Sequence, residues 1–340
     1  MARIAINGFG RIGRLFLRQV LSKNDSGINV VAVNDLGSVE NLAYLLKHDT
    51  VYRTFDREIL VQDGQIVIAG RPIKFLQIKE AEELPWKDLK IDLVVESTGV
   101  FESYEKAQVH LKAGAKRVVI TAPAKDADGV LGQTVLLGVN EDDLKKSAII
   151  SNASCTTNAV SPIIQIMSET IGIEKAILST VHGYTATQNN VDGPVRGSDF
   201  RRGRAAAQNI TPSTTGAALA VTRAIKNLEG KFDGIALRVP VAAGSIADIT
   251  FLTKRNTTPE EINEIFRKAA ESSRWRGILK VSDEQLVSSD ILGEPYGAIV
   301  DAGFTKVVDG NLAKVLSWYD NEWGYASTLV KHVTKAVGLL

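Results

Sequence analysis

The first third of the chain alternates short apolar runs with stretches whose apolar residues recur at helical spacing. Residues 3–7 form the first run, and residues 14–21 follow with apolar side chains on one helical face. The series continues with strands expected at 28–33, 91–96, 117–121 and 135–139 and a helix at 103–113. Strands that alternate with helices in this way predict a parallel sheet covered by helices. A hairpin predicted at 60–68, around Asp63-Gly64, interrupts the series.

After residue 151 the pattern changes. Longer, antiparallel-looking strands are predicted at 175–181, 234–239, 247–253, 298–308 and 312–319. The last two flank Asp309-Gly310, a dipeptide typical of hairpin turns. Helices are expected at 259–272 and 324–337. These features predict an α+β domain that is distinct from the parallel first half.

A glycine-rich turn joins the first strand to the first helix. Its sequence is Gly8-Phe9-Gly10-Arg11-Ile12-Gly13, and the next strand ends in Asn34-Asp35. In this arrangement the glycines allow a tight turn, close approach of the backbone to a pyrophosphate, and close packing of helix on strand. The acid at the second strand end can accept hydrogen bonds from the adenosine ribose. The pattern therefore predicts dinucleotide binding.

Asp35 also bears on which dinucleotide is used. A carboxylate repels a 2′-phosphate, and no lysine or arginine stands between residues 34 and 38 to offset that repulsion. The cofactor expected is therefore NAD. A basic residue that arrives from elsewhere in the fold would weaken this argument.

The fold class predicted is α/β, with a Rossmann-type doubly wound parallel sheet plus an α+β domain with a mainly antiparallel sheet. We expect an NAD-binding domain at residues 1–150 and the α+β domain at residues 151–320. A C-terminal helix at residues 321–340 is expected to return to the NAD-binding domain.

Cys155 is the only cysteine in the 340 residues. It follows the apolar run 148–150 and precedes a predicted helix, and the stretch Ser151–Asn158 around it is rich in hydroxyls and amides. Free N–H groups and the helix dipole favour an anion at a helix N-terminus, so a reactive thiolate is expected. The alternative is a buried, inert cysteine, which the polar surroundings make less favourable.

Four histidines are available as a partner for this thiol. His48, His110 and His332 are more simply surface or packing residues, whereas His182 ends an apolar strand beside a turn. An imidazole held there could activate the thiol and take up a proton during the reaction. A purely structural role for His182 is equally open, because no carboxylate can be named that would orient it.

Basic residues in the second half suggest anion binding. A loop carries Arg196, Arg201, Arg202 and Arg204, and a hydroxyl-rich stretch at 211–218 leads into a helix. A solvated loop or a subunit contact would also explain these arginines. Arg238 interrupts an apolar strand, where an arginine is costly unless it meets a carboxylate or a ligand anion.

The composition excludes several other classes. The formal net charge is +1, so no dedicated nucleic-acid site is expected. One cysteine excludes an intramolecular disulfide and a cysteine-rich zinc site, and no metal site is expected. No run of about 18 apolar residues occurs, and no apolar signal segment precedes the first strand, so no membrane association is expected.

Several motifs together resemble one family. They are Asn7–Arg14, Ser151–Asn158, Thr180–His182, Ser213–Ala218, Arg238–Pro240 and Trp318–Tyr325. This set is similar to the NAD-type phosphorylating glyceraldehyde-3-phosphate dehydrogenases and covers the whole chain in order. The resemblance implies a catalytic α+β domain, NAD as cofactor, and a cytoplasmic homotetramer. It implies oxidation of glyceraldehyde 3-phosphate, with inorganic phosphate, to 1,3-bisphosphoglycerate.

The resemblance also implies individual roles. Cys155 would be the nucleophile that forms a thiohemiacetal and then a thioester, and His182 would be its base. Thr185 and Arg238 would hold the phosphate of the substrate. The attacking phosphate would be held by Ser154, Thr156, Arg202, Thr215 and Gly216. The cofactor contacts would be Gly8, Gly10, Arg11, Ile12, Gly13, Asp35, Lys79, Thr121 and Asn321.

Some choices stay open at this point. Lys79 stands where the family commonly has an arginine, and Arg201 competes with Arg202 for the phosphate. An erythrose-4-phosphate dehydrogenase on the same scaffold is an alternative function, and a non-catalytic thiol sensor or interaction protein is another. A sensor needs only a reactive cysteine, whereas acyl transfer also needs a base and anion sites. The glycolytic or gluconeogenic direction is not encoded in these patterns.

Overall fold

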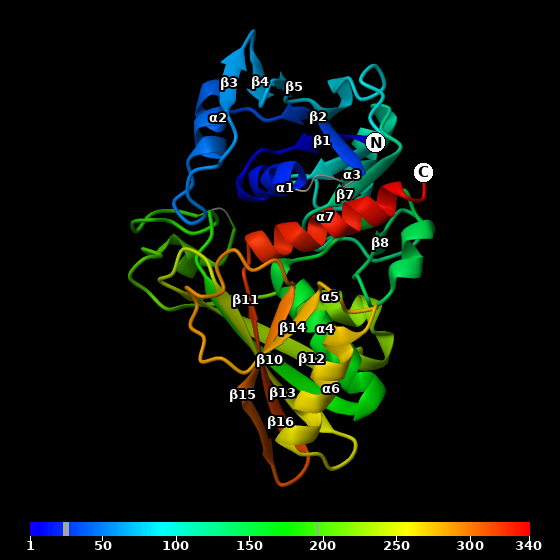
Figure 1. The fold of residues 1–340 in the computed structure, drawn as a ribbon, viewed down its shortest axis with the longest axis vertical. Coiled ribbons are helices and arrows are strands. Elements are labelled where there is room, and N and C mark those ends of the chain that lie inside the picture. The colour runs from blue at the N-terminus through cyan, green and yellow to red at the C-terminus, as the bar shows by residue number, and fades with distance from the viewer. Residues whose placement is uncertain (23–26, 196) are drawn as a thin grey trace. The chain divides into compact units, whose positions relative to one another are not determined.

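The computed structural model describes residues 1–22, 27–195 and 197–340. Two compact units make up the chain (Figure 1). The first comprises Met1–Val135, Asn140–Ala153 and Leu329–Leu340, and the second comprises Leu136–Val139 and Ser154–Thr328. Each unit has a sheet and an apolar core of its own.

The first unit is built on a nine-stranded sheet with the order β3-β4-β5-β2-β1-β6-β7-β9-β8. Its strands are β1 (Ala2–Asn7), β2 (Ile28–Asn34), β3 (Ile59–Gln62), β4 (Gln65–Ile68), β5 (Arg71–Leu76), β6 (Leu93–Glu96), β7 (Arg117–Ile120), β8 (Gln133–Thr134) and β9 (Ile149–Ser151). Neighbours from β5 to β8 pair in parallel, whereas β3, β4 and β5 form an antiparallel meander. The predicted parallel sheet and the predicted hairpin are therefore both confirmed.

Three helices accompany this sheet in the described part of the chain. They are α1 (Arg11–Ser22), α2 (Val39–Lys47) and α3 (Tyr104–Lys112), with short 3₁₀ turns at Ala81–Glu83 and Glu141–Lys145. Of these, α1 and α3 match the helices predicted at 14–21 and 103–113. The hydroxyls of Ser38 and Ser103 cap α2 and α3 by accepting a backbone N–H three residues further on. The last turns of α7 (Trp323–Val337) add Leu329 and Val333 to the apolar core of this unit.

The strand expected at residues 135–139 is wrong. Only the two residues of β8 pair with β9, and the chain then turns, with the Val139 N–H donating to the Leu136 carbonyl at 3.0 Å. Gly138 adopts φ +77°, a left-handed conformation that ends an extended run. A Cβ at this position would lie 2.5 Å from the Trp275 ring, so the turn also depends on close packing.

The second unit is built on a seven-stranded sheet with the order β11-β12-β10-β13-β16-β15-β14. Its strands are β10 (Ile173–Gly183), β11 (Thr211–Thr214), β12 (Phe232–Val239), β13 (Ser245–Thr253), β14 (Leu279–Ser282), β15 (Ala298–Val308) and β16 (Leu312–Tyr319). The β10–β12 and β14–β15 pairs are parallel, and the other neighbouring pairs are antiparallel. The mainly antiparallel sheet expected for this half is confirmed.

Three helices pack on one face of this sheet (Figure 1). They are α4 (Cys155–Thr170), α5 (Ala217–Ala224) and α6 (Pro259–Glu271), and 3₁₀ turns lie at Phe200–Gly203 and Lys226–Leu228. Leu178 of β10 is fully buried in this core, whereas its neighbour Ile177 points to the other face and is 60% exposed. Ile235 of β12 lies on the same outer face and is 51% exposed. The outer face of the sheet therefore presents apolar side chains to solvent.

His332 lies on the part of α7 that belongs to the first unit. We expect acid to destabilise the protein because this buried ring resists protonation. Burial lowers the pKa of His332 to about 3, against an ordinary value of 6.5, so the folded state keeps this ring neutral. Below pH 6.5 the unfolded chain takes up a proton that the folded chain does not, and stability falls as the pH falls towards 3. The free energy of unfolding should fall between pH 7.5 and pH 5, and in His332→Gln this fall should be smaller by about 2 kcal/mol. Urea unfolding at the two pH values measures it. An unchanged pH dependence would contradict this assignment.

Candidate active site

The glycine-rich turn between β1 and α1 is shaped by three different steric demands. Gly8 has φ +92°, and a Cβ there would lie 2.6 Å from the backbone of Ser97. A Cβ on Gly13 would lie 2.3 Å from the Gly8 carbonyl oxygen, so this glycine allows helix and turn to pack closely. Gly10 is exposed and has no heavy atom within 4 Å of its Cβ position. The turn is therefore closed on the protein side and open where a pyrophosphate would lie, which fits a dinucleotide.

A cavity of about 570 Å³ lies beside this turn, at the carboxyl ends of β1, β2 and β6. Asp35 lines it, and its carboxylate accepts hydrogen bonds from the Phe9 N–H at 2.7 Å and the Gly37 N–H at 2.9 Å. Lys79 also lines it, exposed and paired with Glu80. Asn7, Asn34 and Thr98 line the same cavity, although none of them is among the predicted cofactor contacts. Their place at strand ends was the available signal.

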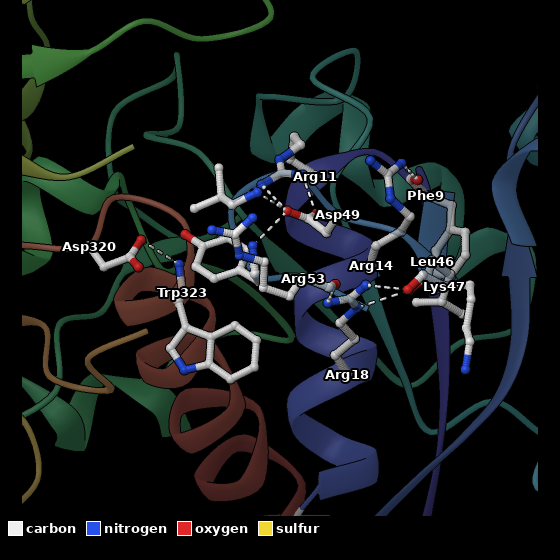
Figure 2. Close-up of polar contacts among 12 residues, drawn as sticks. Phe9, Arg11, Arg14, Arg18, Leu46, Lys47, Asp49, Arg53, Asp320 and Trp323 are labelled. Atoms are coloured by element: carbon white, nitrogen blue, oxygen red, sulfur yellow. Dashed lines mark hydrogen bonds and ion pairs between the residues drawn. The ribbon is translucent and has the colours of Figure 1, made fainter. Parts of the chain in front are cut away.

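Arg11 and Ile12 begin α1, directly after the turn. The Arg11 guanidinium forms an ion pair with Asp49, whose side chain is buried (Figure 2). Asp49 also accepts the N–H groups of Val51 and Tyr52, at 2.9 and 3.0 Å. These contacts and the Arg11 guanidinium hold the pKa of Asp49 below its usual range, although its burial alone would raise it. A cofactor contact by Arg11 stays a prediction, as do those by Ile12 and by Thr121, which follows β7.

Cys155 is the first residue of α4 in the second unit. Ser154 occupies the N-cap position, and its hydroxyl accepts the Thr157 N–H at 3.1 Å. The Cys155 Sγ lies 3.4 Å from Nε2 of His182, which sits in β10. Cys155 therefore lies at a helix start, as expected from the sequence. For His182 the sequence left two roles open, a partner of the thiol or a structural residue, and this distance favours the first.

The protonation of this pair differs from the expectation. Burial raises the pKa of the Cys155 thiol, and the opposing effects of Arg238 and of the Thr156 N–H do not overcome it. Burial, followed by the Arg238 charge, lowers the pKa of His182 to about 3. The raised thiol pKa opposes the resting thiolate expected from the helix N-terminus, because desolvation in the ligand-free site acts against a charge on the sulfur. Both shifts favour a thiol beside a neutral imidazole in this site.

Arg238 reaches the imidazole from the neighbouring strand. The parallel register of β10 and β12 places His182 directly opposite Arg238, and Nη1 of the arginine lies 2.7 Å from Nδ1 of the histidine. The Gly183 carbonyl lies 2.6 Å from the same Nδ1. Burial lowers the pKa of Arg238, which nonetheless remains a cation at neutral pH. A fixed positive charge therefore lies beside the thiol and the imidazole.

Tyr319, at the end of β16, is a residue of this site that the sequence argument did not name. Its hydroxyl bonds to the hydroxyls of Thr156, at 2.9 Å, and Thr180, at 2.7 Å. Its ring packs edge-on against His182, with centroids 5.9 Å apart. Burial raises the pKa of Tyr319, so the phenol stays neutral and a hydrogen-bond donor. The motif that contains Tyr319 was noticed in the sequence, but its contact with the histidine depends on the sheet order.

The arginine-rich loop brings one arginine against the sheet. Nη2 of Arg202 donates to the Ser213 hydroxyl at 2.8 Å, and Nη1 donates to the Thr187 hydroxyl at 3.3 Å. Arg201 is more exposed and pairs with Asp199 at 2.9 Å, and Arg204 pairs with Asp192. Arg196 lies outside the described residues.

The remaining predicted residues lie at element ends. Thr185 follows β10, and its hydroxyl bonds to that of Thr187 at 2.9 Å. Thr215 and Gly216 immediately precede α5, and the Thr215 hydroxyl accepts the Ala217 N–H. The Asn321 amide oxygen accepts the Gly244 N–H and the Ser245 hydroxyl, at 3.0 and 2.9 Å. Next to it, Asp320 accepts the Trp323 N–H at the start of α7 (Figure 2).

Within the described ranges, no three side chains of histidine, cysteine, aspartate or glutamate come together as they would around a metal ion. In the part of the chain that the structure describes, no helix is long and apolar enough to span a membrane.

Comparison with known proteins follows this division of the chain. Residues 2–104 match the family model "Glyceraldehyde 3-phosphate dehydrogenase, NAD binding domain", and residues 154–321 match the model of the C-terminal domain of the same family. A relative from Mycobacterium avium, named glyceraldehyde-3-phosphate dehydrogenase, is 49% identical over 334 residues, covering 96% of each chain. One of the same name from Thermotoga maritima is 49% identical and covers 97% of each chain. A Bacillus subtilis relative, glyceraldehyde-3-phosphate dehydrogenase 2, is 44% identical over 97% of this chain and 96% of its own. This chain belongs to the glyceraldehyde-3-phosphate dehydrogenase family and carries its NAD-binding domain.

Proposed function

We propose that this protein oxidises glyceraldehyde 3-phosphate to 1,3-bisphosphoglycerate, with NAD as hydride acceptor and inorganic phosphate as second substrate. The observation that carries the proposal is the Cys155–His182 pair, 3.4 Å apart beside the Arg238 cation, in a chain with an NAD-binding domain. The names of the relatives favour this reaction over oxidation of erythrose 4-phosphate. A thiol sensor would not need the imidazole and the arginine at the same sulfur.

The first chemical step is attack of the Cys155 sulfur on the aldehyde carbon. The S–C bond forms, the C=O π bond breaks, and the thiol proton passes by way of His182 to the new oxyanion, giving a thiohemiacetal. The buried site keeps thiol and imidazole neutral until the substrate arrives. The charge that develops then lies close to the Arg238 cation, which stabilises it.

The second step turns the thiohemiacetal into a thioester. Bound NAD supplies the acceptor for the hydride that leaves the substrate carbon. His182 takes the hydroxyl proton as the C=O bond re-forms, through the same Nε2 that faces the sulfur. A phosphate oxygen then attacks the thioester carbon, the Cys155 sulfur leaves as a thiolate, and that thiolate recovers a proton from His182.

Anion binding at two places is part of the proposal. Arg238 and Thr185 are proposed to hold the substrate phosphate, and the attacking phosphate would be held by Ser154, Thr156, Arg202, Thr215 and Gly216. Arg202 is favoured over Arg201 because it lies against the hydroxyl-bearing strand β11. The Thr156 hydroxyl is already bonded to Tyr319, so the N–H of Thr156 is the better donor to an anion.

The NAD-binding residues proposed are Gly8, Gly10, Arg11, Ile12, Gly13, Asp35, Lys79, Thr121 and Asn321. The open cavity beside Gly10 and Asp35 supports the adenosine and pyrophosphate contacts among them. Residues 1–150 would form the NAD-binding domain, residues 151–320 the catalytic domain, and residues 321–340 a helix that returns to the former.

We also propose a cytoplasmic homotetramer. The support is the outer face of the seven-stranded sheet, where Ile177 and Ile235 stand exposed on neighbouring strands. A second copy that covers this face would remove apolar surface from water.

An absorbance assay for NADH tests the proposed reaction. Glyceraldehyde 3-phosphate with NAD should give NADH only when inorganic phosphate is present, and NADP should be a poor substitute because of the Asp35 carboxylate. No NADH with thiol-reduced protein would refute the reaction. Phosphate-independent turnover would refute the acyl-transfer step, and faster turnover of erythrose 4-phosphate would favour the other dehydrogenase.

A further inference from the structure

A buried hydrogen-bond network lies behind the cofactor cavity in the first unit. Its centre is Glu96, the last residue of β6, which is 2% exposed. His110 of α3 and Trp86 are fully buried beside it, and Asn7 at the end of β1 is 2% exposed. None of these four residues has a role in the chemistry proposed above.

The protonation of His110 follows from its neighbours. The Trp86 indole N–H can only donate, and it lies 3.2 Å from Nδ1 of His110. Nδ1 therefore offers a lone pair, and the ring proton is on Nε2, which lies 2.9 Å from Oε2 of Glu96. A second proton on Nδ1 would oppose two N–H groups in the buried interior. His110 is thus a neutral ring that donates to Glu96.

Glu96 is surrounded by donors. Its Oε2 accepts the His110 Nε2–H and the Asn7 amide N–H, the latter at 2.7 Å. Its Oε1 accepts the Thr98 backbone N–H at 2.9 Å and the Thr98 hydroxyl. Three of these four partners are N–H groups, which can only donate, so the arrangement suits a carboxylate that accepts on both oxygens. The buried charge is stabilised by these hydrogen bonds.

The network continues in one direction to the cavity. Because the Asn7 amide N–H points to Glu96, its oxygen is left to accept the Asn34 amide N–H at 2.8 Å. The Asn34 oxygen then accepts the Ile78 N–H at 2.9 Å. Asn7, Asn34 and Thr98 all line the cavity of about 570 Å³. Asn7 and Thr98 therefore contact Glu96 directly, and Asn34 is linked to it through Asn7.

We propose that Glu96, oriented by His110 and Trp86, is a positioning residue that fixes Asn7, Asn34 and Thr98 for the dinucleotide. The proposal rests on NAD binding by this domain and not on the aldehyde chemistry. A wrong orientation of any of these amides would present a donor where the cofactor needs an acceptor, or the reverse.

Glu96→Gln is the first test, with Glu58→Gln, at an exposed position outside the network, as matched control. In one orientation the new amide N–H₂ opposes the His110 Nε2–H and the Asn7 amide N–H, and in the other it opposes the Thr98 backbone N–H. We expect the Kd for NAD to rise at least about tenfold by isothermal titration, with the KM for glyceraldehyde 3-phosphate unchanged. An unchanged Kd would overturn the proposal.

The second test keeps the proposal falsifiable if Glu96→Gln does not fold. The chain has four histidines, so ¹⁵N-histidine labelling resolves each ring by NMR. In the wild type, His110 should carry its proton on Nε2 alone. Trp86→Phe, which lies outside the cavity lining, should mix the two tautomers and raise the Kd for NAD several-fold. A Nδ1–H or doubly protonated His110 in the wild type, or a mixed tautomer with unchanged Kd, would overturn the proposal.

These outcomes separate this proposal from the function itself. If the wild type binds NAD but does not oxidise the aldehyde, the reaction fails and the positioning role stands on the binding and NMR measurements. If the wild type does not bind NAD, the cofactor assignment fails first, and the positioning role fails with it.

Discussion

Cys155→Ser should lower turnover by at least about 10⁴-fold while the protein still binds NAD. A serine hydroxyl in the same place is a far weaker nucleophile, and a neutral imidazole whose pKa is held at about 3 is a poor base for removing its proton. The glycine-rich turn and the Asp35 cavity belong to the other unit, so their binding of NAD does not depend on the sulfur. Turnover is measured as NADH formation, and NAD binding by isothermal titration.

The single cysteine makes this prediction easy to control. Alkylation by iodoacetamide can modify one thiol per chain, so loss of activity and loss of free thiol should run in parallel in the wild type. The serine variant should take up no label and keep the wild-type melting temperature. Substantial turnover in that variant would refute the assignment of Cys155 as nucleophile.

His182→Asn should lower kcat by about 10²–10⁴-fold. The asparagine amide can still fill the space under Tyr319, but it cannot accept the proton that leaves the thiol or the thiohemiacetal hydroxyl. Because the thiol pKa is raised by burial, the proposed reaction depends on a base within reach of the sulfur, and Nε2 of His182 lies 3.4 Å from it. The measurement is single-turnover formation of NADH, which isolates the acylation half-reaction.

His48→Asn is the matched control for this variant, because His48 is exposed and caps α2 in the other unit. It should leave kcat unchanged. If His182→Asn slowed alkylation of Cys155 without slowing NADH formation, His182 would tune the thiol and not act as the base.

Much of this fold follows from periodicity alone. The strands at Ala298–Val308 and Leu312–Tyr319 were predicted at their observed bounds, because long alternating runs around an Asp-Gly turn leave little choice of register. Residues 135–139 were predicted wrongly as a strand, because the left-handed Gly138 depends on its packing against Trp275. An apolar run alone does not distinguish a strand from a buried turn.

The sequence indicated which residues belong to the site, but not their protonation or their contacts with residues distant in the chain. Cys155 stood out as the sole cysteine at a helix start, but the direction of its pKa depends on how much water the folded protein excludes. Tyr319 and Glu96 were not named, because each contacts residues distant in sequence: Thr156 for the former and Asn7 for the latter. Contacts of this kind are set by strand order, which composition and spacing do not give.

The parallel register of β10 and β12 also limits which sequence changes keep His182 and Arg238 side by side. His182 and Arg238 face one another because the parallel register of the two strands pairs these two positions. Inserting or deleting one residue in either strand would turn one of the two side chains to the opposite face of the sheet. An insertion in either strand that no bulge absorbs would therefore separate the imidazole from the guanidinium, whereas an insertion in a connecting loop leaves their register unchanged.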